Sequence, residues 1–451
     1  MVAMHKEESF VIIELGSYMT KAMQDVTDVN KLPTVLIRSR AGIIKQEEAT
    51  ELTPAASNDN QTPVELKDAS TSIDSATNKQ VEVPQADESK AEAGLTSDSE
   101  QDSSGPNYVF GSALENADAN TIDSTVEIMT NGFVNDWDAL SAFLRHIVTK
   151  ELGIRISDNT SAFLFSIPVQ WPKSDMENLA QIAFEDINAP TIMIMEQPLL
   201  AAYGNGGVTG IVIDMGHDTT TVTPVVDSAV QNSSIAQTAV SGAAVTTRLH
   251  ELLQADAETR EQFDDASVPL AFAVALKESG LCVIQLPGTD AADTSERQTF
   301  EFGGKSYTVS NDVLARAPDI LVQPTQASES VLTALVRQAV LGCDTDKRAA
   351  LWENIHIVGG SAQFSGLRER LQFELENTVL PASNIFALSQ TRDTRFHTLP
   401  EYFVGWRGHA HWAAFLGACL VAKVALADAR HFVSRAEYND SGPSIIHTKS
   451  F

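Results

Sequence analysis

The stretch from Ile211 to Val226, IVIDMGHDTTTVTPVV, has residue types and spacing that could bind a phosphate chain. An apolar run ends at Asp214, Gly216 follows two residues later, and a second run rich in β-branched residues comes next. This order predicts a strand, a tight turn and a returning strand. Because backbone N–H groups in a glycine-containing turn can hold an anion, the hairpin is a candidate phosphate-binding element.

The same plan occurs near the N-terminus. VIIELGSYMTKA (11–22) and IVIDMGHDTTTV (211–222) both contain an apolar strand, a carboxylate, one residue, a glycine, polar residues and a second strand. Two such hairpins predict a duplicated domain with a cleft between the copies, where both turns could hold one phosphate chain. Each glycine could instead serve only to make an ordinary turn.

A third glycine-rich element, VGGSAQFSG (358–366), follows a predicted strand and opens a predicted helix. The N-terminal end of a helix favours anions and allows a ligand to approach the backbone closely. Three such elements in this order indicate a phosphate-binding cleft more specifically than any one of them does.

The elements that must position these turns alternate along the chain. Strands are expected at 10–15, 33–38, 161–168, 191–197 and 355–360. Helices are expected at 136–152 with Asn135 or Asp136 as the cap, at 174–187, at 198–204 with Pro198 in the first turn, at 243–253 and at 364–375. Alternating strands and helices indicate an α/β fold.

The segment 46–106 differs from the rest of the chain. It has no aromatic residue and holds 14 Asp or Glu against 3 Lys. Such a segment cannot bury enough apolar surface to offset the entropy lost on ordering, so it is expected to be a disordered acidic insert. It is interpreted either as a solvated spacer or as an acidic tail for histones or another basic partner.

Net charge limits the partners. Of the formal −29 of the 451 residues, −11 lies in the acidic segment, which leaves −18 on the remainder. An excess of negative charge disfavours direct contact with nucleic-acid phosphates. No apolar run approaches the ~18 residues that span a bilayer, and no signal peptide precedes the first strand, so we expect an intracellular protein without a membrane partner.

Neither the cysteines nor the histidines have the spacing of a metal site. Cys282, Cys343 and Cys419 are odd in number and far apart, which argues against a disulfide framework and a zinc site. His146, His356 and His411 lie on unrelated segments and are interpreted as structural.

Long ordered stretches of the chain resemble actin. They are NGFVNDWDALSAFLRHIVTKELGI, KSYTVSNDVLARAPDILVQP, WENIHIVGGSAQFSGLRERL and the closing EYNDSGPSIIHTKSF. The resemblance covers nearly everything outside the acidic segment. It implies the actin fold, with two ribonuclease-H-like α/β domains around a central nucleotide cleft. Residues 1–204 plus 413–451 would form the first domain, which carries the insert, and residues 205–412 the second.

Conventional actin fits less well. The acidic segment lies where actin has a short loop that docks the next subunit of a filament, and like-charged copies would repel there. The loop after LVQP also looks shortened. We therefore expect an actin-related protein that does not form filaments. The motifs LWENIHIVGG and LPEYFVGWRG, with the acidic insert, most resemble the actin-related protein 9 subfamily of fungal SWI/SNF and RSC chromatin remodellers.

The resemblance assigns a set of residues to the nucleotide cleft. The phosphate side would hold Gly16, Ser17 and Lys21 from the first hairpin and Asp214 and Gly216 from the second. Gln197 matches the family's water-orienting glutamine. The nucleoside side would hold Lys277, Glu278, Gly359, Gly360 and Ser361.

Other positions depart from the family. Glu14 replaces an aspartate, Tyr18 and Asp218 replace glycines, and His217 replaces an acidic residue. At an effective dielectric constant of about 20, two like charges ~4 Å apart repel by roughly 4 kcal/mol, so Asp218 would oppose a polyanion. Thr221 replaces the histidine that orients water, and a hydroxyl is a poor general base. We expect no enzyme activity and no cofactor; ATP with Mg²⁺ remains the alternative.

What remains is a scaffold with an apolar groove, which in actins accepts amphipathic helices. The matching positions are Tyr203, Val208, Leu420, Val421 and Val424, although these side chains could simply close the domain junction. The resemblance implies a nuclear subunit that binds the helicase/SANT-associated helix of a remodeller ATPase beside a second actin-related protein. The alternatives are an actin-like ATPase and a cytoskeletal, dynactin-type actin-related protein.

Overall fold

The computed structural model of the chain describes residues 6–45, 106–117, 121–287, 296–323, 330–379, 394–425 and 429–449. By its internal contacts the chain divides into one unit of Met1–Ile44 with Tyr108–Phe451 and a second of Lys45–Asn107. The predicted acidic insert, apart from Pro106, and the loop from residue 324 to 329 lie outside the described residues. The division of the first unit into two domains stays a prediction.

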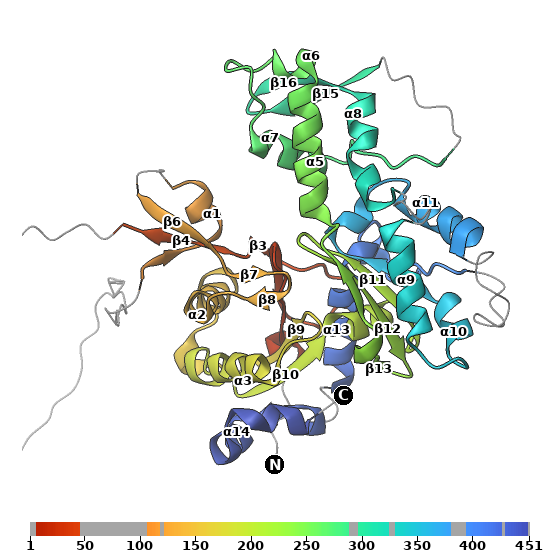
Figure 1. Cartoon of the computed structure of the whole chain (residues 1–451). Coiled ribbons are helices and arrows are strands. Elements are labelled where there is room, and N and C mark those ends of the chain that lie inside the picture. Colours follow the sequence, from red (N-terminus) through yellow and green to blue (C-terminus); the bar gives the residue numbers. More distant parts are fainter. Residues whose placement is uncertain are drawn as a thin grey trace, which may run out of the picture. The chain divides into compact units, whose positions relative to one another are not determined.

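A six-stranded sheet carries the first predicted hairpin (Figure 1). Its order is β18 (Val433–Ser434), β10 (Thr191–Glu196), β9 (Ala162–Ile167), β1 (Val11–Glu14), β2 (Met19–Gln24) and β3 (Val35–Arg38). β1 pairs with β2 in antiparallel register and with β9 in parallel register. The strands expected from the sequence at 10–15, 33–38, 161–168 and 191–197 are therefore confirmed.

A five-stranded sheet repeats this arrangement around the second hairpin. It contains β13 (Ala229–Val230), β12 (Thr220–Val226), β11 (Gly210–Met215) and β17 (Ile355–Val358), with β14 (Ala236–Thr238) paired to β12. β11 pairs with β12 in antiparallel register and with β17 in parallel register, as β1 does with β2 and β9. The predicted duplication of the hairpin is thus a duplication of the sheet core around it.

The helices follow the strands in the alternation that the sequence predicted. They are α1 (Gly111–Glu115), α2 (Trp137–His146), α3 (Lys173–Gln181), α4 (Gln197–Gly204), α5 (Gly242–Ala255), α6 (Ala257–Arg260), α7 (Leu270–Glu278), α8 (Asn311–Arg316), α9 (Val331–Leu341), α10 (Arg348–Trp352), α11 (Leu367–Glu374), α13 (Ala413–Ala425) and α14 (Arg435–Ser441). π-helical turns extend α2 and α3 to Glu151 and Asp186. Of the two expected caps, Asp136 starts α2: its carboxylate accepts a hydrogen bond from the N–H of Ala139 at 2.9 Å.

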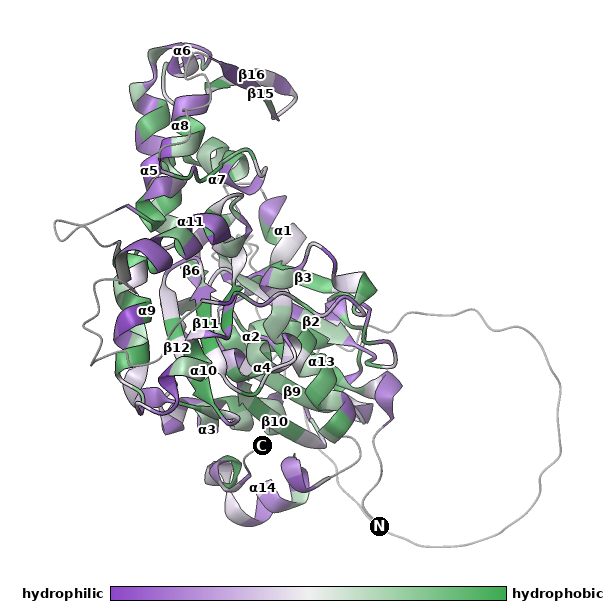
Figure 2. Ribbon diagram, turned by 90° about the vertical axis from the view of Figure 1, so that its right-hand side faces the viewer, coloured by the Kyte–Doolittle hydropathy of each residue, from purple (hydrophilic) through white to green (hydrophobic). Residues whose placement is uncertain are grey.

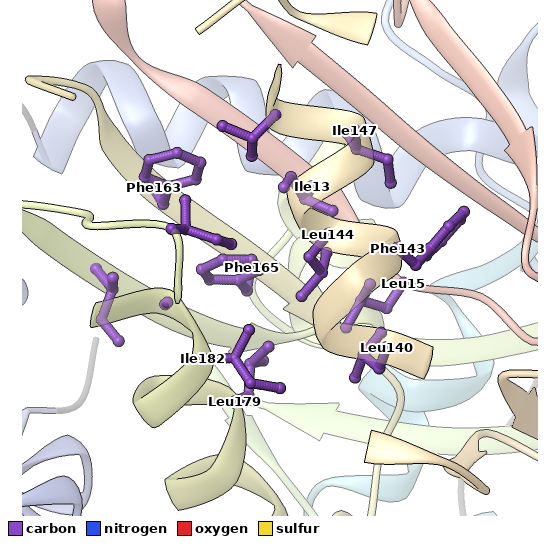
Figure 3. Packing of buried hydrophobic residues seen from close by; sticks show 14 of the residues in the cluster. Ile13, Leu15, Leu140, Phe143, Leu144, Ile147, Phe163, Phe165, Leu179 and Ile182 are labelled. Atoms are coloured by element: carbon purple, nitrogen blue, oxygen red, sulfur yellow. The ribbon is translucent and has the colours of Figure 1, made fainter. Parts of the chain in front are cut away.

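The centre of the first sheet is buried on both faces, which explains why β1 and β9 are nearly continuous apolar runs. All six residues of β9 are buried. Phe163 and Phe165 point toward α2 and α3 and meet Leu144 and Leu179 there (Figure 3). Leu164, which lies between them on the strand, belongs to the cluster on the opposite face, together with α4 and α13.

The helices α4 and α13 pack so closely that their backbones touch. A Cβ added to Gly417 would overlap the carbonyl oxygen of Leu200, and one added to Gly204 would overlap the carbonyl oxygen of Ala413. Small residues at a helix crossing permit this approach. This contact joins α4, near the middle of the chain, to α13, near its C-terminal end.

Three smaller sheets complete the described part of the chain. They are β15 (Arg297–Phe302) with β16 (Lys305–Ser310), β4 (Arg40–Ile44) with β5 (Tyr108–Val109) and β6 (Ile122–Glu127), and β7 (Met129–Thr130) with β8 (Phe133–Val134). The β15–β16 hairpin and the helices α5, α7 and α8 share a core of their own, which includes Phe272 and Tyr307. α6 and this hairpin are largely hydrophilic, whereas β9 to β11 are hydrophobic (Figure 2). Within the described ranges, no helix is both long and apolar enough to cross a membrane.

Candidate functional site

The two hairpins bring two carboxylates and one lysine together. Glu14 on β1 lies opposite Lys21 on β2, and the two side chains form an ion pair. Glu14 is only 7% exposed, and its Oε2 atom has no hydrogen-bond partner in the part of the chain that the structure describes. Burial, and then the charge of Glu14, raise the pKa of Asp214 on β11 to about 6, while Lys21 opposes this rise. Two of the predicted phosphate-side residues, Lys21 and Asp214, therefore interact electrostatically across the two sheets.

Asp214 should make folding stability depend on pH. Since its pKa in the folded state, about 6, lies above the ordinary aspartate value of 3.8, the folded protein holds this proton more tightly than the unfolded chain. The contribution of Asp214 to stability is then greatest below pH ~4, falls as the pH rises to ~6 and is flat above that. Asp214→Asn should gain about 2 kcal/mol at pH 7, after a discount for partial exposure, and lose this slope.

Urea unfolding at pH 4, 5, 6 and 7 checks this prediction. Asp227→Asn is the matched control: its carboxylate has a lowered pKa because Lys347 donates a hydrogen bond to it, so its removal should bring no gain. An Asp214→Asn protein that is less stable than the original at pH 7 would show that the buried carboxylate is stabilising.

The turn of the first hairpin is bonded to the chain itself. Gly16 is required, since a Cβ there would come within 2.6 Å of the carbonyl oxygen of Met19. The hydroxyl oxygen of Ser17 accepts a hydrogen bond from the N–H of Gly132 at 2.9 Å. Tyr18 extends from the turn, and its hydroxyl donates to Oε1 of Glu278 at 2.6 Å.

The turn of the second hairpin meets the third glycine element. The N–H of Gly216 donates to Thr219 within the turn, and the hydroxyl of Ser361 donates to the carbonyl oxygen of Gly216 at 3.2 Å. Gly359 has φ +90°, and a Cβ on it would lie 2.6 Å from the carbonyl oxygen of Met215. The glycine there allows close contact with β11.

Among the remaining cleft residues, Lys277 and Gln197 are also hydrogen-bonded within the chain. Nζ of Lys277 donates to the carbonyl oxygen of Gly242 at 3.2 Å, and burial lowers the pKa of this lysine. Nε2 of Gln197, at the start of α4, donates to the carbonyl oxygen of Leu15 at 2.6 Å. Thr221 lies opposite Asp214 in the hairpin. A Cβ on Gly360 would meet no atom within 4 Å.

The substituted positions His217 and Asp218 have partners as well. Oδ2 of Asp218 accepts a hydrogen bond from the N–H of Asn131 at 2.9 Å. The ring of His217 stacks on that of Tyr18, with centroids 4.2 Å apart. Burial, together with the charge of Lys277, lowers the pKa of His217.

The five predicted groove residues lie on or beside the α4–α13 pair. Tyr203 and Leu420 are half-buried and pack on the same apolar cluster, while Val421 is buried within it. Val208 and Val424 are exposed by 52% and 65%. Four of the five are therefore at least partly accessible to a partner.

Four residues that the sequence did not point to also line the cleft: Arg38, Asn131, Gly132 and Gly242. His411, for which the sequence indicates only a structural role, is a fifth. The N–H of Gly359 donates to the carbonyl oxygen of His411, and burial lowers the pKa of that imidazole to about 4. A glycine at the start of a predicted helix could have pointed to Gly242. Nothing in the local sequence marks Arg38, which reaches the cleft from β3.

No group of histidine, cysteine or acidic side chains among the described residues could hold a metal ion. His146 pairs with Glu151 on the surface, and His356 is buried beside His397. Cys282, Cys343 and Cys419 are free and buried, and burial raises the pKa of each thiol.

Comparison with known proteins agrees with the fold. A family model described as actin matches residues 5–451. "Actin-related protein 7" of Oryza sativa subsp. indica is 26% identical over 351 residues, covering 74% of this chain and 88% of the relative. Its namesake in Arabidopsis thaliana is 27% identical over 346 residues, with 73% and 86% covered. "Actin-like protein 9" of Bos taurus is 25% identical over 338 residues, covering 72% of this chain and 74% of the relative. The chain therefore belongs to the actin family, as an actin-related protein.

Proposed function

We propose that this chain is a non-catalytic scaffold subunit of an ATP-dependent chromatin-remodelling complex of the SWI/SNF or RSC type. The observation that carries the proposal is the apolar surface on α4 and α13. Val208, four residues after α4, and Val424 on α13 are more than half exposed, and Tyr203 and Leu420 on the same two helices are half-buried. A partner could therefore bury these side chains at little conformational cost.

The occupant that we propose for this surface is the helicase/SANT-associated helix of the motor ATPase. An amphipathic helix places apolar side chains one turn apart, which suits a groove formed by two packed helices. The chain's formal charge of −29 would attract a basic helix and speed its association. A second actin-related protein on the same helix, and residence in the nucleus, follow from the resemblance to the subfamily 9 remodeller subunits.

We infer the absence of catalysis from two residues, Gln197 and Thr221. Hydrolysis needs an oriented water and a group that accepts its proton. The amide of Gln197 already donates to the carbonyl oxygen of Leu15, and Thr221 has no basic atom that could replace an imidazole. An actin-like ATPase is therefore the weaker reading, and steady phosphate release from Mg-ATP by the purified chain would favour it.

Introducing positive charge on the apolar surface should weaken the complex. The double variant Val208→Arg/Val424→Arg should recover at least about tenfold less remodeller ATPase from nuclear extract, because it places two cations where the basic helix packs. Quantitative mass spectrometry of the captured proteins measures this loss. Leu270→Arg is the matched control, since Leu270 is equally exposed on the distant α7 and should leave recovery unchanged.

Two results would contradict the proposal. The first is recovery of dynactin subunits without any remodeller ATPase. The second is equal recovery of the ATPase by the double variant and the original chain, which would move the interface elsewhere. In that case, titration of the purified motor helix into the double variant and into the original chain shows whether other proteins of the extract mask a difference in affinity.

A further inference from the structure

The nucleotide that the actin family implies does not fit the residues of this cleft as they are arranged. Three matching groups are already bonded to the chain: Ser17 to Gly132, Lys277 to Gly242, and Glu278 to Tyr18. A ligand that uses Oε1 of Glu278 would have to displace the Tyr18 hydroxyl, whereas Ser17 keeps its own hydroxyl proton and Lys277 keeps two further N–H donors. The charge of a nucleoside triphosphate would also approach the carboxylate of Asp218. Hydrogen bonds that must be exchanged rather than added contribute little net affinity.

Tyr18 is at the centre of these contacts. One face of its ring stacks on His217, with centroids 4.2 Å apart and 22° between the planes. The guanidinium carbon of Arg38 lies 3.7 Å from the centroid of the same ring. The Tyr18 hydroxyl donates to Oε1 of Glu278, and Arg38 approaches that oxygen to 3.6 Å. Stacking, a cation–π contact and a charge-assisted hydrogen bond thus converge on one side chain.

The groups that meet at Tyr18 come from both large sheets and from a helix. Tyr18 lies in the β1–β2 turn and Arg38 on β3, both in the six-stranded sheet. His217 lies in the β11–β12 turn of the five-stranded sheet, and Glu278 ends α7. A second bond, from the N–H of Asn131 to Asp218, joins the same β11–β12 turn to the β7–β8 turn.

Carboxylates of the chain itself act on the basic groups at this contact. The charge of Glu278 acts on Arg38, Lys277 and His217, and the charge of Asp218 acts on His217. Side-chain carboxylates supply the negative charge beside these basic groups, so the contact requires no ligand.

We propose that Tyr18 takes the place of the nucleotide: it bridges the cleft and holds the two sheets together with no ligand bound. Arg38, His217 and Glu278 are positioning residues for its ring and hydroxyl. The inference concerns the cleft and not the α4–α13 surface, so it can fail while the proposed helix binding holds, and the reverse.

Hydrogen–deuterium exchange of the full chain tests the proposal. Amides of residues 214–222 and 270–280 are followed with and without Mg-ATP in the original protein and in Tyr18→Phe and Tyr18→Ala. Tyr18→Phe keeps the stacked ring and loses the hydroxyl, so exchange in both segments should rise about fivefold. Tyr18→Ala loses both and should raise it by at least about tenfold. Tyr402→Phe, at an exposed tyrosine, should match the original protein.

Mg-ATP should leave exchange in the original protein unchanged. The proposal is overturned if Mg-ATP slows exchange of these segments in the original chain, because the nucleotide would then be the bridge. It is equally overturned if Tyr18→Phe exchanges as slowly as the original. Should Tyr18→Ala fail to fold, the milder Tyr18→Phe and the double-mutant cycle with Glu278→Gln still decide whether the hydroxyl and the carboxylate are coupled.

Discussion

Gly417→Ala is expected to destabilise the folded chain by about 3 kcal/mol or more, the upper range for overpacking of a tightly packed core. The added methyl group would lie 2.6 Å from the carbonyl carbon of Leu200 and 3.1 Å from the amide nitrogen of Gly204. Both are backbone atoms of α4, so neither can rotate away as a side chain could. The helices α4 and α13 would have to separate, and the alanines between them would lose contact.

Urea unfolding measures this loss, with Gly360→Ala as the control. A Cβ on Gly360 would meet no atom within 4 Å, so that variant should stay within about 1 kcal/mol of the original. Because Tyr203 and Leu420 lie on the two helices that would separate, Gly417→Ala should also weaken binding of the proposed helix. Equal urea midpoints for Gly417→Ala and the original chain would contradict the close crossing.

Trp406→Ala should cost about 3–5 kcal/mol, the usual range for the loss of a large buried aromatic side chain. Trp406 is 1% exposed and belongs to the same apolar cluster as α4 and α13. Its indole N–H donates to the carbonyl oxygen of Val29 at 2.7 Å, so truncation also removes the partner of a backbone carbonyl. The loop that precedes α13 would lose its attachment to the segment after β2.

Trp406→Phe separates the contribution of the buried ring from that of the indole hydrogen bond. It keeps most of the buried ring and loses the N–H donor, so it should cost much less than Trp406→Ala. Tyr402→Ala is the control, because that side chain is 68% exposed four residues away and should change stability little. Thermal and urea unfolding of the three variants check the order, and a Trp406→Ala protein as stable as Tyr402→Ala would exclude the anchoring role.

Local pattern was sufficient to predict the main elements and the repeated hairpin from the sequence. The apolar runs around Ile12, Leu164 and Ile213 are β-strands because each is buried on both faces, and burial of this kind leaves a continuous signal. Asp136 caps α2, and Gly216 makes its turn, for reasons that involve only a few neighbouring residues. The order of the motifs was also enough to predict the actin family, which the comparisons confirm.

The contacts inside the cleft depend on tertiary structure. Tyr18 and Glu278 are 260 residues apart in the chain, and no periodicity relates them. Arg38 reaches the Tyr18 ring only because β2 and β3 are neighbours in the sheet. In the sequence Tyr18 is simply a large residue at a glycine position, which predicts a damaged phosphate loop; the fold surrounds its ring with Arg38 and His217 and gives its hydroxyl an acceptor. Residue type and spacing therefore determined the strands, the turns and the family. The hydrogen-bond and ion-pair partners of the cleft residues were instead decided by the packing of the two sheets and α7, because these partners depend on distances that local sequence does not encode.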